Sequence, residues 1–355
     1  MHKDTKNYRK NCIFVPEILK KMDNPYIKQF PDLMSGKKIL YVHGFASSGQ
    51  SGTVGRLRTV FPNATVISPD LPIHPEEAFT LLHQVCDDEH PDLIIGTSMG
   101  GMYTEQLYGY DRICVNPAFR IADTMQEHGL TGKQQFQNPR LDGVQEFYVD
   151  KPLMKEYRAI TEKNFAHADD ESEQQRVFGL FGDKDELVHT RDLFRSYYAQ
   201  DIPFDGEHRM NDHSFMHSVV PVIRWISDRQ EQRQRPIIYI GIESLTHCTL
   251  QKERELKPLP SCQKAVRLLI ERYEVFFVSP SPYGGGWEEA WLTEYIGVPS
   301  WHHTIFTHRR DLLYGDYLIT KKKEDDTMAT LLHFGSDTFK TWDDIIEYFS
   351  RLGGQ

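Results

Sequence analysis

The residues that most constrain the fold of this chain run from Leu93 to Met102 and read LIIGTSMGGM. A short apolar run leads directly into Gly-x-Ser-x-Gly, and a segment able to form a helix follows it. This order predicts a sharp strand-to-helix turn that lifts Ser98 out of the edge of a sheet in a strained backbone conformation. Gly96 and Gly100 remove the side chains that would collide with such a turn. The helix that begins there would direct free N–H groups towards negative charge.

Short apolar segments alternate with helical segments on both sides of this turn. The expected strands of this part are 39–42, 64–68, 93–95, 113–115 and 177–181. Parallel strands are buried on both faces, so continuous apolar runs of this length favour a parallel, doubly wound sheet. The polar residues between the last two strands have no regular pattern, and we expect an insertion over about 117–176 that serves as a lid or substrate wall.

The strand pattern starts again after a polar segment near 228–235, and 355 residues are too many for a typical single domain. The expected strands of this second part are 237–240, 275–278, 304–307, 316–319 and 330–334, with helices at 261–273, 287–295 and 342–352. We therefore predict three parts. They are an N-terminal extension over 1–35 with a short helix from Pro16 to Met22, an α/β domain over 36–232, and a smaller Rossmann-like α/β domain over 236–355.

Composition restricts the partners and the cellular location that we expect. The formal net charge of −10 argues against a general nucleic-acid binder. The five cysteines are odd in number and widely spaced, which indicates reduced thiols in a cytosolic protein. The only apolar stretch near the N-terminus, 12–15, is far too short for a signal peptide or a membrane span. We expect a cytoplasmic protein with neither nucleic-acid nor membrane partners. The sequence is compatible with a homo-oligomer and does not determine the oligomeric state.

The serine hydroxyl is a poor nucleophile until a base removes its proton, and the base needs an acid to orient it. In hydrolases with this kind of turn, the chain order is serine, acid, histidine. Asp185 follows the expected strand 177–181 at a suitable distance, so it is the predicted acid. Asp183 is the alternative acid, although it fits a solvated turn carboxylate better.

The histidine that acts as the base is predicted from its place in the sequence, after the acid and before the last helix of the domain. His213, in the sequence NDHSF, satisfies that rule and is the predicted base. His208 and His217 are the alternatives.

A negatively charged oxygen formed when such a serine attacks a carbonyl group needs two preorganised N–H donors. One predicted donor is the backbone N–H of Met99, the residue after the serine. The other is expected in the loop after the first strand, HGFA at 43–46, where Phe45 is preferred and Ala46 is the alternative.

Several further motifs lie between Ile39 and Trp225. They are YVHGF at 41–45 with serines at 47 and 48, GTSMGG at 96–101, VNPA at 115–118 with Arg120, the segment 132–136, and the segments around Asp185 and His213. With these motifs, this part of the chain resembles the small bacterial esterases of the YqiA–YcfP group of α/β-hydrolases.

The resemblance implies an α/β-hydrolase fold and hydrolysis of carboxylic esters with short to medium acyl groups, through a Ser98–His213–Asp185 triad and an acyl-enzyme. The implied substrate class extends to acyl thioesters. It implies a small-molecule substrate and neither metal nor organic cofactor. An amidase or peptidase that uses the same triad is an alternative.

A second set of motifs follows residue 236. They are FFVSP at 276–280, the segment 287–297, Thr307 with Arg310, DYLI at 316–319, and the segment 334–349 around WDD. This part resembles the haloacid-dehalogenase-type phosphatases, in particular the 5′(3′)-deoxyribonucleotidase branch. The resemblance implies a phosphate-binding remnant at Ser279 and Arg310.

Two catalytic elements of that superfamily are missing here. Its first strand ends in Asp-x-Asp, whereas this chain has Gly241-Ile242-Glu243, and glycine cannot form a phospho-aspartate. The acidic pair expected to bind magnesium is replaced by Thr320-Lys321. We therefore expect a pseudo-phosphatase used for packing, oligomerisation or phosphate sensing, and a nucleotide-responsive scaffold is the alternative function for the whole chain.

Overall fold

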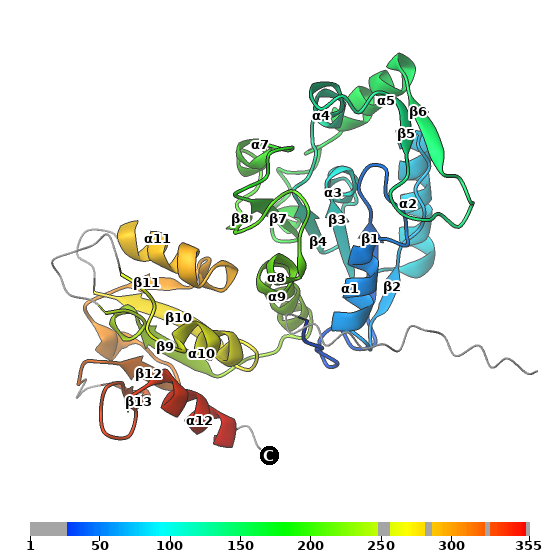
Figure 1. The fold of residues 1–355 in the computed structure, drawn as a ribbon. Helices are drawn as coiled ribbons and strands as arrows, with labels where there is room; N and C mark the ends of the chain where they lie inside the picture. Colours follow the sequence, from blue (N-terminus) through cyan, green and yellow to red (C-terminus); the bar gives the residue numbers. More distant parts are fainter. Residues whose placement is uncertain (1–26, 248–255, 281–285, 324–326, 353–355) are drawn as a thin grey trace, which may run out of the picture.

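The computed structural model describes residues 27–247, 256–280, 286–323 and 327–352. Within those residues, two separate parallel sheets form, one between residues 38 and 204 and the other between residues 237 and 333 (Figure 1). We refer to residues 27–230 as the N-terminal unit and to residues 237–352 as the C-terminal unit. The helix expected from Pro16 to Met22 lies outside the described residues.

The larger sheet has the strand order β2-β1-β3-β4-β7-β8, and all its neighbouring strands are parallel. Its strands are β1 (Lys38–Val42), β2 (Thr65–Ile67), β3 (Leu93–Thr97), β4 (Arg112–Val115), β7 (Val177–Gly182) and β8 (Asp201–Phe204). The predicted fold, an α/β-hydrolase with a parallel doubly wound sheet, is confirmed. β8 is not among the expected strands, because its sequence DIPF contains a proline that cannot donate to a ladder and is tolerated at the sheet edge.

Successive residues of each strand face two different hydrophobic cores, as strand geometry requires. Leu40 and Val42 pack with α2 (Pro75–Glu89) and α3 (Met99–Glu105), whereas Ile39 and Tyr41 pack with α1 (Gly52–Val60) and α9 (Val220–Gln230). Helices therefore cover both faces of the sheet. The described part of the expected N-terminal extension also packs here, because Met34 is fully buried in the second core.

The insertion over 117–176 is more regular than its composition suggests. It contains α4 (Ile121–Glu127), the hairpin of β5 (Gly132–Gln135) and β6 (Glu146–Val149), α5 (Lys151–Thr161) and α6 (Glu171–Gln174). α5 buries residues 153, 154, 157 and 160, a helical spacing that the polar residues between them obscure in the sequence. In Figure 1, α4, α5 and the hairpin gather at the end of the N-terminal unit that is remote from the C-terminal unit.

The C-terminal unit contains a parallel sheet of order β11-β10-β9-β12-β13. Its strands are β9 (Ile237–Gly241), β10 (Glu274–Ser279), β11 (Thr304–Phe306), β12 (Tyr317–Thr320) and β13 (Thr330–His333). Apolar residues of α10 (Cys262–Leu269), α11 (Gly286–Tyr295) and α12 (Trp342–Leu352) pack into one core with this sheet. Counted from β9, the order is third, second, first, fourth, fifth, which is the order of doubly wound nucleotide-binding folds.

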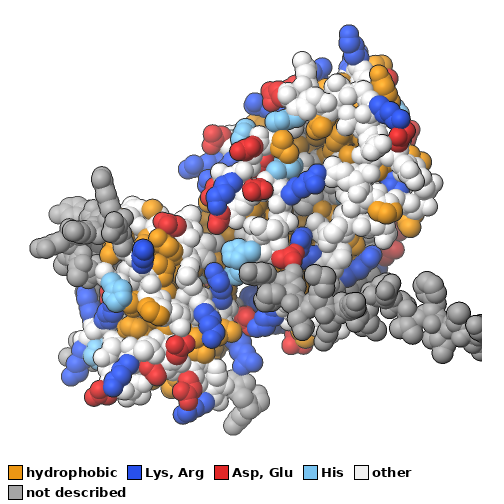
Figure 2. Space-filling view, viewed as in Figure 1, with side chains coloured by type: hydrophobic (Ala, Val, Ile, Leu, Met, Phe, Trp, Pro, Cys, Tyr) orange, Lys and Arg blue, Asp and Glu red, His pale blue; other side chains and the backbone are white. Residues whose placement is uncertain are grey.

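Figure 2 shows acidic and basic side chains interspersed over the viewed face of both units. None of the helices in the described ranges is both long enough and apolar enough to cross a lipid bilayer.

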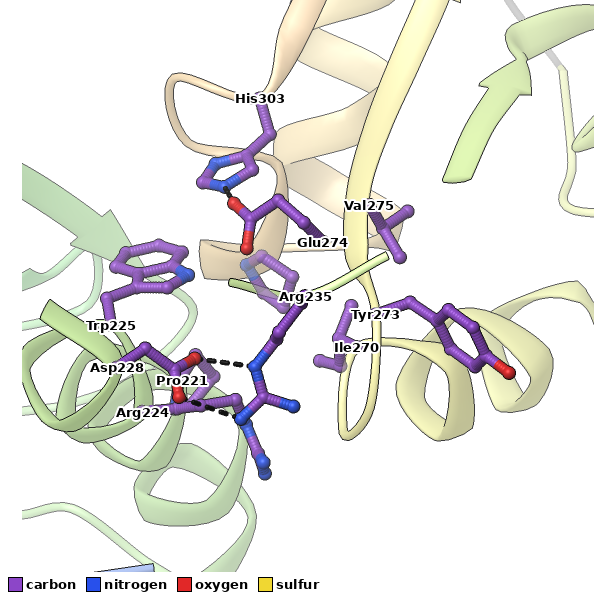
Figure 3. A pocket seen from close by; sticks show the side chains of 11 residues that line it. Pro221, Arg224, Trp225, Asp228, Arg235, Ile270, Tyr273, Glu274, Val275 and His303 are labelled. Carbon is purple, nitrogen blue, oxygen red and sulfur yellow. Dashed lines mark hydrogen bonds and ion pairs between the residues drawn. The ribbon is translucent and has the colours of Figure 1, made fainter. Parts of the chain in front are cut away.

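The two units contact each other through α9 and the residues that precede β11. Trp225 stacks on Trp301, with ring centroids 6.0 Å apart, and on His303, at 5.2 Å. Arg235, in the connection between the units, forms an ion pair with Asp228 at 2.6 Å. Figure 3 shows Trp225, Asp228, Arg235 and His303 around a small crevice between α9 and the start of β10. The crevice has a volume of about 20 Å³, which is room for about one water molecule.

Candidate active site

Ser98 lies in a strained turn between β3 and α3. Its backbone has φ of 55° and ψ of −120°, outside the regions that side chains of L-residues favour. A Cβ atom on Gly96 would lie 2.2 Å from the carbonyl oxygen of Gly100, and one on Gly100 would lie 2.0 Å from that of Val42. Both glycines are therefore required by close backbone approach. This is the strand–turn–helix arrangement that the sequence predicts.

His208 joins Ser98 to Asp185 in one hydrogen-bonded series. The Nε2 atom of His208 is 3.1 Å from the Oγ atom of Ser98, and its Nδ1 atom is 2.8 Å from Oδ2 of Asp185. The backbone N–H groups of Leu187 and Val188 donate to the other oxygen of Asp185, at 2.8 and 3.0 Å. The structure therefore connects three residues that lie far apart in the sequence.

The charge of Asp185 indicates which nitrogen of His208 carries a proton. Burial raises the pKa of Asp185, but the hydrogen bond and charge of His208 and the two backbone donors outweigh burial, so the pKa lies below its usual value. An ionised carboxylate only accepts hydrogen bonds, so Nδ1 of His208 carries a proton and donates it. When the ring is neutral, Nε2 can accept a hydrogen bond from the hydroxyl of Ser98.

The prediction that His213 is the base is wrong. His213 lies in α8 (Asp212–Ser214), is exposed, and stacks on His217 with ring centroids 4.1 Å apart. His208, one of the two alternatives, follows β8 by four residues and so lies at the edge where the carboxyl ends of the parallel strands meet. β8 has a weak sequence signal, so the helix that follows it is the landmark left in the sequence, and this helix favours His213.

The other candidate acid, Asp183, has a structural contact instead. Its Oδ1 atom accepts a hydrogen bond from the backbone N–H of Gly206 at 3.0 Å, which ties the loop after β7 to the loop that carries His208. Of the two aspartates, the structure places Asp185 against the histidine.

Asn116 is a residue of the site for which the sequence analysis assigned no role. Its side-chain oxygen accepts from the N–H of Gly182 at 2.7 Å, and its amide nitrogen donates to the carbonyls of Glu207 and His208, both at 3.1 Å. These bonds connect the end of β4 with the loops that bear Asp185 and His208. The available signal was a polar residue directly after the buried strand beside β3, within the VNPA motif.

The predicted donors for a negatively charged oxygen lie beside Ser98. Met99 is the first residue of α3, so its N–H has no acceptor within the helix. Phe45 lines the same cleft as Ser98, and a Cβ atom on the preceding Gly44 would lie 3.3 Å from the Cβ atom of Ser98. The loop after β1 therefore packs directly against the serine.

His43 holds this loop in place and acts as a neutral residue. Its Nδ1 atom is 2.9 Å from the carbonyl oxygen of Gly44, to which it donates, and its Nε2 atom accepts from the N–H of Leu71 at 3.0 Å. Burial lowers the pKa of His43, in agreement with a neutral ring that donates on one side and accepts on the other.

The hydroxyl of Ser98 opens into a cleft of about 700 Å³, within the range of small-molecule sites. Residues of the insertion form one wall, among them Ile121 and Leu130, and the loop after β7 contributes Leu187 and Val188. Polar side chains line much of the remainder, so the cleft combines apolar surface with many hydrogen-bonding groups.

The residues predicted as a phosphate-binding remnant are both engaged by carboxylates. The buried hydroxyl of Ser279 donates to Glu288 at 2.9 Å. The buried guanidinium of Arg310 donates to both oxygens of Glu243, at 2.9 and 3.0 Å, and to the hydroxyl of Thr320 at 2.7 Å. Burial raises the pKa of Glu243, but the hydrogen bonds and charge of Arg310 prevail and hold it below its usual value.

The carboxylate of Glu243 also occupies the space that a side chain at residue 241 would enter. A Cβ atom on Gly241 would lie 2.3 Å from Oε1 of Glu243. β9, β10 and β12 end at Gly241, Ser279 and Thr320, so these residues share the sheet edge where doubly wound folds bind ligands. At that edge the described residues form an internal ion pair.

Comparisons with known proteins agree with both resemblances. The model of a family described as an uncharacterised protein family, UPF0227, matches residues 38–226. A protein of Vibrio phage KVP40 named "Putative 5'(3')-deoxyribonucleotidase" is 26% identical over 164 residues, which cover 38% of this chain and 96% of the phage protein. Among solved structures, Est1E from Butyrivibrio proteoclasticus is 15% identical and has a TM-score of 0.38, with 58% of this chain and 92% of that chain covered.

Proposed function

Because the chain belongs to the UPF0227 family over residues 38–226, we propose that this part of the protein is a serine esterase that cleaves carboxylic esters through an acyl-enzyme. The observation that carries the proposal is the hydrogen-bonded series from Ser98 through His208 to Asp185. Serine, imidazole and carboxylate in this order are the groups that activate a hydroxyl for attack on a carbonyl carbon.

In the proposed reaction, Nε2 of His208 takes the proton of Ser98 as its oxygen attacks the ester carbonyl. The ionised Asp185 stabilises the positive charge that forms on the imidazole, because it already accepts the Nδ1 proton. The N–H groups of Phe45 and Met99 would bind the negatively charged oxygen. His208 then gives its proton to the leaving alcohol, and water cleaves the acyl-enzyme by the same steps.

We propose short to medium acyl groups as substrates, acyl thioesters included, since the volume of the cleft suits a small molecule and one wall is partly apolar. A cytoplasmic location is part of the proposal, supported by the free thiols of Cys86, Cys114 and Cys262. For the C-terminal unit we propose a structural role without phosphatase activity, since residue 241 offers no nucleophile and Glu243 lies in its place.

The test combines active-site labelling with kinetics. We expect a fluorophosphonate probe to label the protein at Ser98, and Ser98→Ala to lose labelling and at least about 10³-fold in kcat/KM on p-nitrophenyl butyrate. Ser350→Ala, at an exposed serine of α12, is the matched control and should keep both. A series of acyl chain lengths then measures the pocket. Turnover that survives in Ser98→Ala would contradict the proposed function.

A further inference from the structure

The cleft at Ser98 has a charge distribution unlike that of the chain as a whole. The chain carries a formal net charge of −10, yet none of the described residues that line the cleft is Asp or Glu. Arg56 from α1 and Arg209 from the loop after β8 both line it. A cleft with one sign of charge concentrates ligands of the opposite sign.

The two arginines differ in how their charges are balanced. Arg56 forms an ion pair with Asp212 at 2.6 Å, and its guanidinium lies over the ring of Phe215 at 5.5 Å. Arg209 is exposed and donates from Nη2 to the side-chain oxygen of Gln137 at 2.7 Å. Among the residues that the structure describes, no carboxylate pairs with Arg209, so its positive charge remains available in the cleft.

Arg209 is held at the wall of the cleft by a residue of the insertion. It follows His208 directly in the chain, and Gln137, its hydrogen-bond partner, belongs to the insertion. The backbone N–H of Gln137 donates to the carbonyl oxygen of Ala46 at 2.8 Å, which connects this contact to the loop that carries Phe45. A guanidinium has five N–H donors in a planar fork, and the bond to Gln137 uses one of them.

We propose that the substrate of this esterase is an ester that carries a second, anionic group, a carboxylate or a phosphate, and that Arg209 binds that group. The inference rests on the proposed esterase function of Ser98. The guanidinium fork matches the oxygens of either anion in a bidentate arrangement. Arg209 would thus determine specificity while Ser98 and His208 carry out the reaction.

The test measures a ratio of specificities in the full-length protein. Mono-p-nitrophenyl adipate is anionic, and its methyl ester has the same acyl chain without the charge, so the ratio of their kcat/KM values isolates the effect of the anion. A p-nitrophenyl hexanoate with a terminal phosphate replaces the carboxylate in a second arm. In each arm, the kcat/KM value of the anionic ester is divided by that of the neutral methyl ester, and the arm with the larger ratio identifies the preferred anion.

We expect the wild type to favour the anionic ester, and Arg209→Gln to lower this ratio by about threefold to tenfold, as an exposed charge-assisted hydrogen bond allows. Arg209→Lys should retain part of the preference, and Arg209→Glu should reverse it. Arg195→Gln, at an exposed arginine outside the cleft, is the control and should keep the wild-type ratio.

The outcomes separate the two proposals. An unchanged ratio in Arg209→Gln and Arg209→Glu, with turnover of both esters that depends on Ser98, would overturn the anionic substrate and leave the esterase standing. Turnover that does not depend on Ser98 would overturn the esterase itself. A general disturbance of His208 by substitution of its neighbour lowers both rates together, so it does not imitate a change in the ratio.

Discussion

At the residue scale, the hydroxyl of Ser98 is positioned by groups that follow or end five strands, β1, β3, β4, β7 and β8. Gly96 and Gly100 allow the backbone turn, and Asn116 holds the loop of His208 at the end of β4. His208 itself has no special sequence context, since EHRMND at 207–212 is an ordinary polar loop. Among the histidines that the structure describes, His208 is distinguished by the contact of its Nε2 atom with Ser98.

Substitution of the two histidines gives opposite expectations. His208→Ala should lower kcat/KM on p-nitrophenyl butyrate by about 10³-fold or more, because no base then accepts the proton of Ser98. His213→Ala should stay within about twofold of wild type, since its ring is exposed and stacks on His217. Steady-state kinetics on both variants decide which histidine is the base. A large loss in His213→Ala together with a small loss in His208→Ala would identify His213 as the base.

At the scale of the elements, the turn between β3 and α3 and the strand β8 illustrate two kinds of sequence signal. The turn is specified locally, because each of its glycines removes a contact with backbone a few residues away or on the neighbouring strand. β8 has a weak local signal and exists because β7 offers it a partner, with Leu180 paired to Ile202. α5 lies between these cases, since its apolar residues have helical spacing within a polar sequence.

Two glycine-to-alanine substitutions test the turn. Gly100→Ala should destabilise the N-terminal unit by about 3 kcal/mol or more, because the new Cβ atom would lie 2.0 Å from the backbone oxygen of Val42. Gly55→Ala, on the exposed side of α1 with no atom within 4 Å of the new Cβ, should raise stability by about 0.5–1 kcal/mol. Urea unfolding measures both, and equal effects would show that close approach at Gly100 is unimportant.

At the scale of the whole molecule, the two units form one packed body through the aromatic contact of Trp225 with Trp301 and His303. Lys28 and Arg224 of the N-terminal unit add polar bonds to Glu271, one to its carboxylate and one to its carbonyl oxygen. The ion pair between the buried Arg310 and the partly buried Glu243 lies at the carboxyl edge of the C-terminal sheet, whereas Glu271 precedes β10.

We expect Trp225→Ala to uncouple the units. Removing this half-buried ring should cost about 2 kcal/mol and convert one unfolding transition into two, because Trp301 and His303 lose their stacking partner. Differential scanning calorimetry measures the transitions. Tyr148→Ala, at a side chain that is 65% exposed, is the control and should leave the profile unchanged. A single transition at the wild-type temperature in Trp225→Ala would show that the ring does not couple the units.

The parallel sheets, the strained turn at Ser98, the candidate acid Asp185 and the absence of a nucleophile at residue 241 all follow from the order of residues along the chain. Each of these features depends on a short apolar run or on residues whose effect is confined to nearby backbone. The tertiary structure alone decided that His208 rather than His213 reaches Ser98, that Asn116 holds its loop, and that Glu243 neutralises Arg310. Each of these contacts joins residues at least 60 positions apart, so it depends on how strand ends meet at one edge of a sheet, which no local pattern encodes.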